Sequence, residues 1–172
     1  GVATWAALEV WPSLTELTLV EVEPEMQAAG RELLPGARWV EGDISRARGL
    51  VDLVVASYVL GELPEPGVAA AHLWRQSADT LAVIEPGTPT GYRGVLSARD
   101  AVMGAGGRTL APCPHDLACP LRADDWCHFA VRLPRSKLHR HAKGVELGYE
   151  DEKFSYAVLT RADLRGTNLS TA

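Results

Sequence analysis

The sequence predicts an α/β fold built around a mostly parallel sheet, and three observations support this class. Segments rich in β-formers alternate with segments of helical pattern from Leu14 to Gly107. The stretch GLVDLVVAS, residues 49–57, is apolar without polar alternation, which is typical of a parallel strand covered on both faces. A chain of 172 residues, 47% of them apolar, can bury one sizeable core, so we expect one globular domain.

The expected strands share β-branched and apolar residues bounded by turn formers. In chain order they cover residues 14–22, 37–43, 49–57, 80–87, 108–112 and 152–161. The expected helices cover residues 24–34, 64–79 and 92–107. Pro24 suits the first turn of the first helix, and glycines end the third. This alternation predicts parallel strands joined by crossover helices.

The composition argues against several classes of protein. A net charge of -5 and a pI near 5.5 do not fit a generally basic coat for nucleic acid. No apolar run approaches the roughly 20 residues that span a bilayer, and no charged leader precedes an apolar segment, so we expect no membrane partner. The cysteines are odd in number and clustered, which fits a metal site or reactive thiols in a reducing compartment. The expected location is the bacterial cytoplasm or, alternatively, the mitochondrial matrix.

Acidic or small side chains follow the predicted strands, at the edge where open α/β sheets bind ligands. They are Glu21, Asp43, Ser57 with Tyr58, and Glu85. An acid after the second strand of such a sheet can accept hydrogen bonds from both ribose hydroxyls, and another can accept from an adenine amino group. The pattern therefore favours a nucleoside-binding edge. Each acid taken alone is better explained as a solvated turn residue, whereas the ordered set favours a ligand site.

The order of VEVEPEM, EGD, DLVVASYVLGELP and VIEPGTP resembles the core of class I S-adenosylmethionine-dependent methyltransferases. The resemblance implies a Rossmann-like fold that binds S-adenosylmethionine, with Glu21 at the ribose, Asp43 at the adenine, and Ser57 and Tyr58 at the next strand end. It also implies a glycine-rich loop of which Gly1 would be the last glycine. We therefore expect an N-terminally truncated core that lacks its first strand.

The sequence does not identify a catalytic residue. After the strand at 49–57 the turn reads ASYVLGELP rather than the Pro-Pro-aromatic turn of amino-methylating enzymes. The Pro-Cys pair in LAPCP superficially resembles the nucleophile motif of cytosine-C5 enzymes, but it follows the wrong strand. His72 has a helical pattern around it and is expected to be a core or surface histidine.

The stretch CPHDLACPLRADDWCHF holds Cys113, Cys119 and Cys127, separated by five and seven residues. This is not the two-residue gap of zinc ribbons. A closed zinc site remains an alternative, with His115 or His128 as the fourth ligand. A second alternative is that the thiols are buried apolar residues, although the flanking prolines, histidines and acids would make a poor core.

CPHDLACPL, WCHF, LPRSKLHR and GYEDEKFSY together resemble the Rsm22-like family of small-ribosomal-subunit-associated, methyltransferase-like proteins, over essentially the whole chain to about Arg161. The resemblance implies an iron–sulfur cluster of the four-iron type with Cys113, Cys119 and Cys127 as ligands. It implies a fourth cysteine from a segment C-terminal to the EDEKFSY strand. The implied partners are the small ribosomal subunit and its rRNA.

A basic segment follows the cysteines. Its cations are Arg132, Arg135, Lys137, Arg140 and Lys143, with no acid between Asp125 and Glu146. Pro134 suits a helix start, which would place Arg135, His139 and Lys143 on one face for RNA phosphates. The alternative is a solvated helix whose charges pair with the acids at 150–152. The family resemblance favours RNA.

The expected organisation is a methyltransferase core over residues 1–111, a Cys/His and basic metal-binding insertion over 112–148, a returning edge strand over 149–161 and a tail over 162–172. Three functional hypotheses follow. The first is a methyltransferase acting on ribosomal RNA or another small-subunit component, and the second is a non-catalytic assembly factor that keeps the fold. A zinc-stabilised RNA-binding module is the third.

Overall fold

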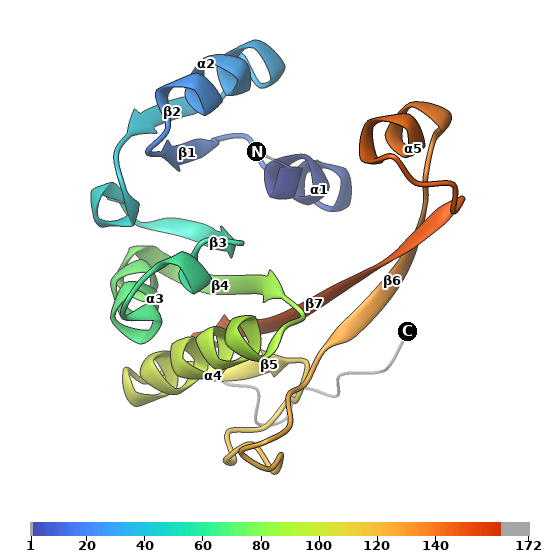
Figure 1. Cartoon of the computed structure of the whole chain (residues 1–172). Helices are drawn as coiled ribbons and strands as arrows, with labels where there is room; N and C mark the ends of the chain where they lie inside the picture. The colour runs from blue at the N-terminus through green and yellow to red at the C-terminus, as the bar shows by residue number, and fades with distance from the viewer. Residues whose placement is uncertain (1, 163–172) are drawn as a thin grey trace.

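A computed structural model describes residues 2–162, so Gly1 and all of the expected tail except Ala162 lie outside the described residues. Its strands form two sheets (Figure 1). In the smaller sheet, β1 (Thr18–Glu21) pairs in parallel with β2 (Arg38–Glu41). The larger sheet has the strand order β3-β4-β7-β5, and β6 pairs with the outer part of β7. Its strands are β3 (Val51–Ser57), β4 (Ser77–Pro86), β5 (Arg108–Ala111), β6 (Phe129–Pro134) and β7 (Tyr149–Thr160).

The position of β7 corrects the expectation of a returning edge strand over 149–161. The second half of β7 pairs antiparallel with β4 on one side and with β5 on the other. It therefore lies inside the sheet, and Ser155, Ala157 and Leu159 are buried because they alternate towards the core. β3, β4 and β5 run in one direction, so β7 is the one reversed strand among these four.

The five α-helices of the described chain are α1 (Val2–Val10), α2 (Pro24–Leu33), α3 (Pro66–Gln76), α4 (Pro89–Gly104) and α5 (Lys137–Lys143). Single 3₁₀ turns form η1 (Ile44–Arg46) and η2 (Leu60–Glu62).

Two of these helices, α3 and α4, cover the larger sheet. They pack against each other and against β4. Between them and the sheet lies one core, with Leu60, Trp74, Leu81, Val102 and Leu159 at most 2% exposed.

The predicted alternation of strands and helices is confirmed, with shifted boundaries. The helix expected over 64–79 ends at Gln76, because Ser77–Asp79 already belong to β4. The helix expected from Pro134 begins at Lys137, since Pro134 still pairs with Tyr149 and the Ser136 side chain accepts the N–H of His139 as the N-cap. The sequence did not predict α1 or β6.

The first half of β7 and β6 form a two-stranded arm that carries α5 at its far end (Figure 1). Every residue of β6 is exposed, and the first half of β7 is almost as open. The arm is therefore held to the core through the continuity of β7.

β3 pairs with β4 along one edge only, and no strand among residues 2–162 pairs with its other edge. On β3, Val51 and Val55 are exposed. The two sheets are not hydrogen-bonded to each other. None of the helices in the described part of the chain is long and apolar enough to cross a membrane.

Candidate functional site

The cysteine segment, residues 112–128, links β5 to β6 and contains all three cysteines. All are free thiols; Cys113 is exposed, while Cys119 and Cys127 are half-buried. Burial raises the pKa of the Cys127 thiol, and the charges of Cys113 and Cys119 raise it further. The three thiols therefore influence one another electrostatically.

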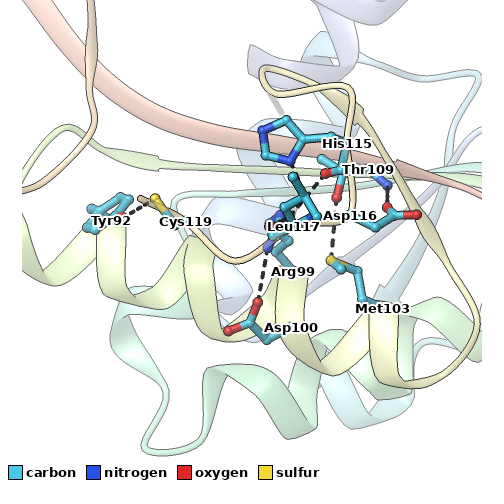
Figure 2. Close-up of polar contacts among 9 residues, drawn as sticks. All are labelled: Tyr92, Arg99, Asp100, Met103, Thr109, His115, Asp116, Leu117 and Cys119. Atoms are coloured by element: carbon cyan, nitrogen blue, oxygen red, sulfur yellow. Dashed lines mark hydrogen bonds and ion pairs between the residues drawn. The ribbon is translucent and has the colours of Figure 1, made fainter. Parts of the chain in front are cut away.

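Helix α4 holds the cysteine segment through Arg99 (Figure 2). The Arg99 guanidinium donates to the backbone carbonyls of His115, at 3.1 Å, and Leu117, at 2.7 Å. It also pairs with Asp100 at 3.2 Å, and its side chain is only 10% exposed. A buried guanidinium costs free energy unless its N–H donors are hydrogen-bonded. The hydrogen bonds from Arg99 therefore hold the carbonyls of His115 and Leu117 in position.

Strand β5 holds the same segment through Asp116 (Figure 2). One carboxylate oxygen accepts from Arg108 at 2.7 Å, and the other accepts from the backbone N–H of Thr109 at 3.0 Å. These hydrogen bonds, that of Arg108 first, lower the pKa of the Asp116 carboxyl. Asp116 thereby ties the cysteine segment back to the strand that precedes it.

Two further hydrogen bonds attach the end of the cysteine segment to the sheet. The Trp126 indole donates to the carbonyl of Gly87 at 3.2 Å, and the Ser155 hydroxyl donates to the carbonyl of Cys127 at 2.7 Å. With the contacts of Arg99 and Asp116, the segment is anchored at four places although it contains no helix or strand. Its backbone is therefore positioned by the core.

Tyr92, in the first turn of α4, reaches a cysteine sulfur directly. Its hydroxyl oxygen lies 3.1 Å from the Sγ of Cys119 (Figure 2). Burial raises the pKa of the Tyr92 phenol, and the hydrogen bond to Cys119 adds to this effect. Tyr92 therefore stays protonated and can act as a hydrogen-bond donor at neutral pH.

The cysteines do not form a single-ion site. Among residues 2–162, no three His, Cys, Asp or Glu side chains are arranged to hold one metal ion. His115 is exposed, and its Nδ1 accepts the N–H of Leu117 at 3.2 Å. His128 is exposed and stacks on Trp126 with 5.8 Å between ring centroids. Both histidines thus have structural contacts of their own.

The structure places Glu21 and Asp43 where the sequence predicted, at the carboxyl ends of β1 and β2. Glu21 accepts the N–H of Glu23 at 3.0 Å, and Asp43 caps η1 by accepting the N–H of Ser45 at 2.8 Å. Hydrogen bonds from Ser45 lower the pKa of the Asp43 carboxyl. Both acids shape local turns, as the turn interpretation expected, and both remain open enough to accept from a ligand.

Ser57 and Tyr58 lie at the end of β3, as predicted. Tyr58 has a positive φ of 56°, which is uncommon for a bulky residue. Its N–H donates to Ile84 at 2.8 Å and its hydroxyl to Glu152 at 3.1 Å. Burial, followed by the bond to Glu152, raises the pKa of the Tyr58 phenol. No hydrogen bond joins this pair to Glu21 or Asp43 in the described chain, so the strand ends form two separate clusters.

Glu85 differs from the other strand-end acids because it points into the protein. It is 1% exposed, and its carboxylate accepts the N–H groups of Val59, Leu60 and Gly61 at 3.0, 2.8 and 3.1 Å. The loop after β3 is therefore folded around this carboxylate. Glu85 organises the ligand edge and has little capacity left to bind a ligand itself.

A cavity of about 310 Å³ opens beside β1, β2 and η1. Val20 and Val40 form its apolar wall, and Arg38, Arg46 and Glu41 contribute charge. Neither Glu21 nor Asp43 lines it.

Most of the basic segment is paired with acids of β7. The Arg135 guanidinium lies 2.9 Å and the Lys143 ammonium 3.0 Å from one Glu150 oxygen, and His139 lies 3.7 Å from the other. Arg132 makes two bonds to Asp151, at 2.7 and 2.9 Å, and stacks on Tyr149.

His139 and Lys143 lie on α5, whereas Arg135 precedes the helix, so the predicted helical spacing of the three holds only for the last two. All three side chains meet Glu150. Hydrogen bonds from Arg135 and then Lys143 lower the pKa of the Glu150 carboxyl. Lys137 and Arg140 make no ion pair with any of residues 2–162.

Sequence reasoning missed Tyr92, Arg99, Trp126 and Ser155, which hold the cysteine segment. One signal was present for Arg99. It shares the buried side of α4 with Val95 and Val102, and an arginine among apolar positions indicates a buried acceptor. The other three carry no such signal, because their partners are backbone carbonyls or a thiol far along the chain.

The sequence pattern of one protein family, described as mitochondrial small ribosomal subunit Rsm22, matches residues 1–170 of this chain. A relative, the human mitochondrial ribosome assembly protein METTL17, is 29% identical over 185 residues. The similarity covers 94% of this chain and 40% of METTL17, so the chain spans less than half the length of that relative.

Solved structures of methyltransferases are similar in fold. A proposed methyltransferase from Thermoplasma acidophilum has a TM-score of 0.57 at 12% identity, covering 94% of this chain and 64% of its own. Magnesium protoporphyrin IX methyltransferase from Synechocystis, with bound SAH, has a TM-score of 0.53 at 11% identity, covering 91% and 68%. The fold is therefore an α/β, methyltransferase-like fold with a mostly parallel sheet.

Proposed function

The chain belongs to the Rsm22 family of mitochondrial small ribosomal subunit proteins, and from this membership we propose that it is a methyltransferase-like factor in assembly of the small ribosomal subunit. The similarity to METTL17, a mitochondrial ribosome assembly protein, supports the assembly role and favours the mitochondrial alternative for its location. The observation that carries the proposal is the cysteine segment, which the methyltransferase-like core anchors at four places.

In this proposal, Cys113, Cys119 and Cys127 ligate an iron–sulfur cluster. Ligands of a cluster bind different irons and lie further apart than ligands of one zinc ion, so the lack of a three-ligand single-ion arrangement among residues 2–162 is compatible with a cluster. The cluster, when bound, would supply a redox-active centre. The chain's own residues fix the backbone that carries the thiols, through Arg99 and Asp116.

The test is iron and sulfide analysis with a visible spectrum after anaerobic reconstitution in the presence of an external thiol, which can fill a fourth ligand position. We expect iron with broad absorption near roughly 400 nm of a cysteine-ligated cluster. Cys119→Ser should lose the iron, whereas Ser136→Ala, on the arm, should keep it. Stoichiometric zinc, or no metal in the wild-type protein, would overturn the cluster and leave the zinc-stabilised module.

We further propose that S-adenosylmethionine binds at the carboxyl ends of β1 to β3. The exposed Asp43 and the half-buried Glu21, together with the similarity to methyltransferase folds, support this assignment. Calorimetric titration with S-adenosylmethionine tests it, and Asp43→Ala should weaken any binding seen; an affinity unchanged by Asp43→Ala would remove the residue from the site.

Contact with small-subunit rRNA is assigned to the arm. Lys137 and Arg140 are the cations best placed for phosphates, since Arg132, Arg135 and Lys143 already pair with acids. Co-sedimentation with small-subunit particles at two salt concentrations tests this contact. The protein should travel with the particles and dissociate as salt rises; a protein that stays at the top of the gradient at low salt would contradict it.

A non-catalytic role is favoured over methyl transfer by the loop after β3. Glu85 occupies the backbone N–H groups of residues 59–61, and no general base was found in the sequence at this edge. Incubation of small-subunit particles with methyl-tritiated cofactor separates the two functions. Absence of label supports the assembly factor; label on rRNA or protein would establish the methyltransferase instead.

A further inference from the structure

We propose that the Tyr92 hydroxyl donates a hydrogen bond to the sulfur of Cys119 in the ligated state and raises the reduction potential of the cluster. This rests on the cluster of the proposed function. Tyr92 would then be a positioning and tuning residue, because it touches the ligand sulfur and not the irons. The contact is the 3.1 Å approach between its oxygen and the Cys119 Sγ (Figure 2).

The backbone that carries Tyr92 is fixed. The Thr88 side chain accepts the N–H of Gly91 at 3.1 Å, and the Thr88 carbonyl accepts the N–H of Tyr92 at 2.9 Å. A Cβ at Gly91 would lie 2.1 Å from the carbonyl oxygen of Pro86, so only glycine allows α4 to sit this close to the end of β4. The first turn of α4 is therefore seated on the core sheet, and Tyr92 projects from a rigid support.

The other side of the contact is also fixed. Arg99, further along α4, holds the Leu117 carbonyl at 2.7 Å, two residues before Cys119. Tyr92 and Arg99 thus reach the cysteine segment from the same helix (Figure 2). Helix α4 therefore makes both contacts, and it fixes the distance from the Tyr92 hydroxyl to the Cys119 sulfur.

The chemistry of ligation fixes the direction of this hydrogen bond. In a free thiol, either the Cys119 sulfur or the Tyr92 oxygen can donate. A cysteine bound to iron is a thiolate without a proton, so Tyr92 must then be the donor. A donor to a charged sulfur makes a charge-assisted bond, and the half-buried setting of both groups strengthens it.

The direction sets the sign of the effect on potential. Reduction adds one electron to the cluster and makes its ligand sulfurs more negative, so a donor stabilises the reduced form more than the oxidised form. Removal of the donor should shift the equilibrium about tenfold towards the oxidised form. For a one-electron couple, that is a fall of about 59 mV in the reduction potential.

The experiment is an anaerobic redox titration of the reconstituted protein, followed by visible absorption and electron paramagnetic resonance. Wild type is compared with Tyr92→Phe, which keeps the ring and removes the hydroxyl. Tyr149→Phe is the matched control, since Tyr149 lies on the arm and its ring contacts Arg132. Iron content and the melting curve of each protein are measured first.

A potential about 59 mV lower in Tyr92→Phe, with Tyr149→Phe unchanged, supports the inference. Equal potentials in all three iron-loaded proteins overturn it while leaving the cluster intact. If wild type binds no cluster, the proposed function fails and the inference fails with it. If only Tyr92→Phe loses iron, site-specific 3-fluorotyrosine at position 92 decides. This stronger donor should raise the potential, and an unchanged potential would overturn the inference.

Discussion

Glu85→Gln tests whether one buried carboxylate holds the ligand edge of the sheet. Glutamine keeps the size of the side chain and one oxygen acceptor. That oxygen can still receive the N–H groups of Val59 and Leu60, which both bond to Oε1. The new amide NH₂ would instead face the N–H of Gly61, whose nitrogen lies 3.1 Å from Oε2, so a donor would meet a donor.

The magnitude follows from these three contacts. A hydrogen bond to a charged acceptor contributes about 1.5–3 kcal/mol, and an unsatisfied buried donor costs about 1–3 kcal/mol. Loss of the bond from Gly61, with the other two weakened by loss of charge, predicts about 3 kcal/mol of lost stability. Small domains have about 5–15 kcal/mol in total, so Glu85→Ala, which removes all three bonds, could unfold the protein outright.

The assay is urea unfolding followed by circular dichroism, combined with amide hydrogen exchange. Glu65→Gln is the control, because Glu65 is exposed and its side chain makes no cap hydrogen bond. We expect a lower midpoint and faster exchange at Gly61 for Glu85→Gln alone. A loss below about 0.5 kcal/mol, which is usual for surface substitutions, would refute the role assigned to Glu85.

Three further predictions concern the cysteine segment and the arm. Arg99→Met should destabilise the cysteine segment by about 2 kcal/mol, seen as faster limited proteolysis there, whereas exposed Arg93→Met should behave as wild type. Because the pKa of Glu150 is depressed in the folded protein, its stabilising contribution is present above about pH 4.5 and is lost as the pH falls. Glu150→Gln should therefore reduce the fall in the free energy of unfolding at acid pH. The same fall in the variant as in wild type would contradict this. The double variant Lys137→Glu, Arg140→Glu should lower RNA affinity. It should also reduce the slope of log affinity against log salt concentration by about 2, roughly one per phosphate contact. An unaltered slope would show that Lys137 and Arg140 do not contact phosphates.

The order of core elements could be predicted because each strand and helix carries its own local pattern. Pro24 starts α2, and the apolar run of residues 49–57 predicts β3. The expected cover on both faces is not seen among residues 2–162, because Val51 and Val55 are exposed and Ala56 is the one fully buried residue of the strand. The place of β7 could not be predicted, since its neighbours β4 and β5 are set by pairing between distant segments. β6 was missed for a related reason: its exposed residues are ordered only by β7.

The candidate site divides in the same way. The sequence located Asp43 and Glu21 at strand ends because a strand end is a local feature. It could not show that Glu85 points inward, since that depends on the fold of the loop after β3. Nor could it decide whether Arg135 would meet RNA or Glu150, because both outcomes fit the same sequence pattern.

The cysteine segment begins and ends beside the same strand. Ala111, just before it, pairs with Val158, and Phe129, just after it, pairs with Phe154. A single strand, β7, therefore closes the loop that contains the thiols, as a disulfide would close it in a secreted protein. Closing a loop in advance removes conformational entropy that ligand binding would otherwise have to oppose. Cluster binding and the pairing of β7 with β5 and β6 are then thermodynamically coupled. On heating, the loss of iron should therefore coincide with melting of these strands.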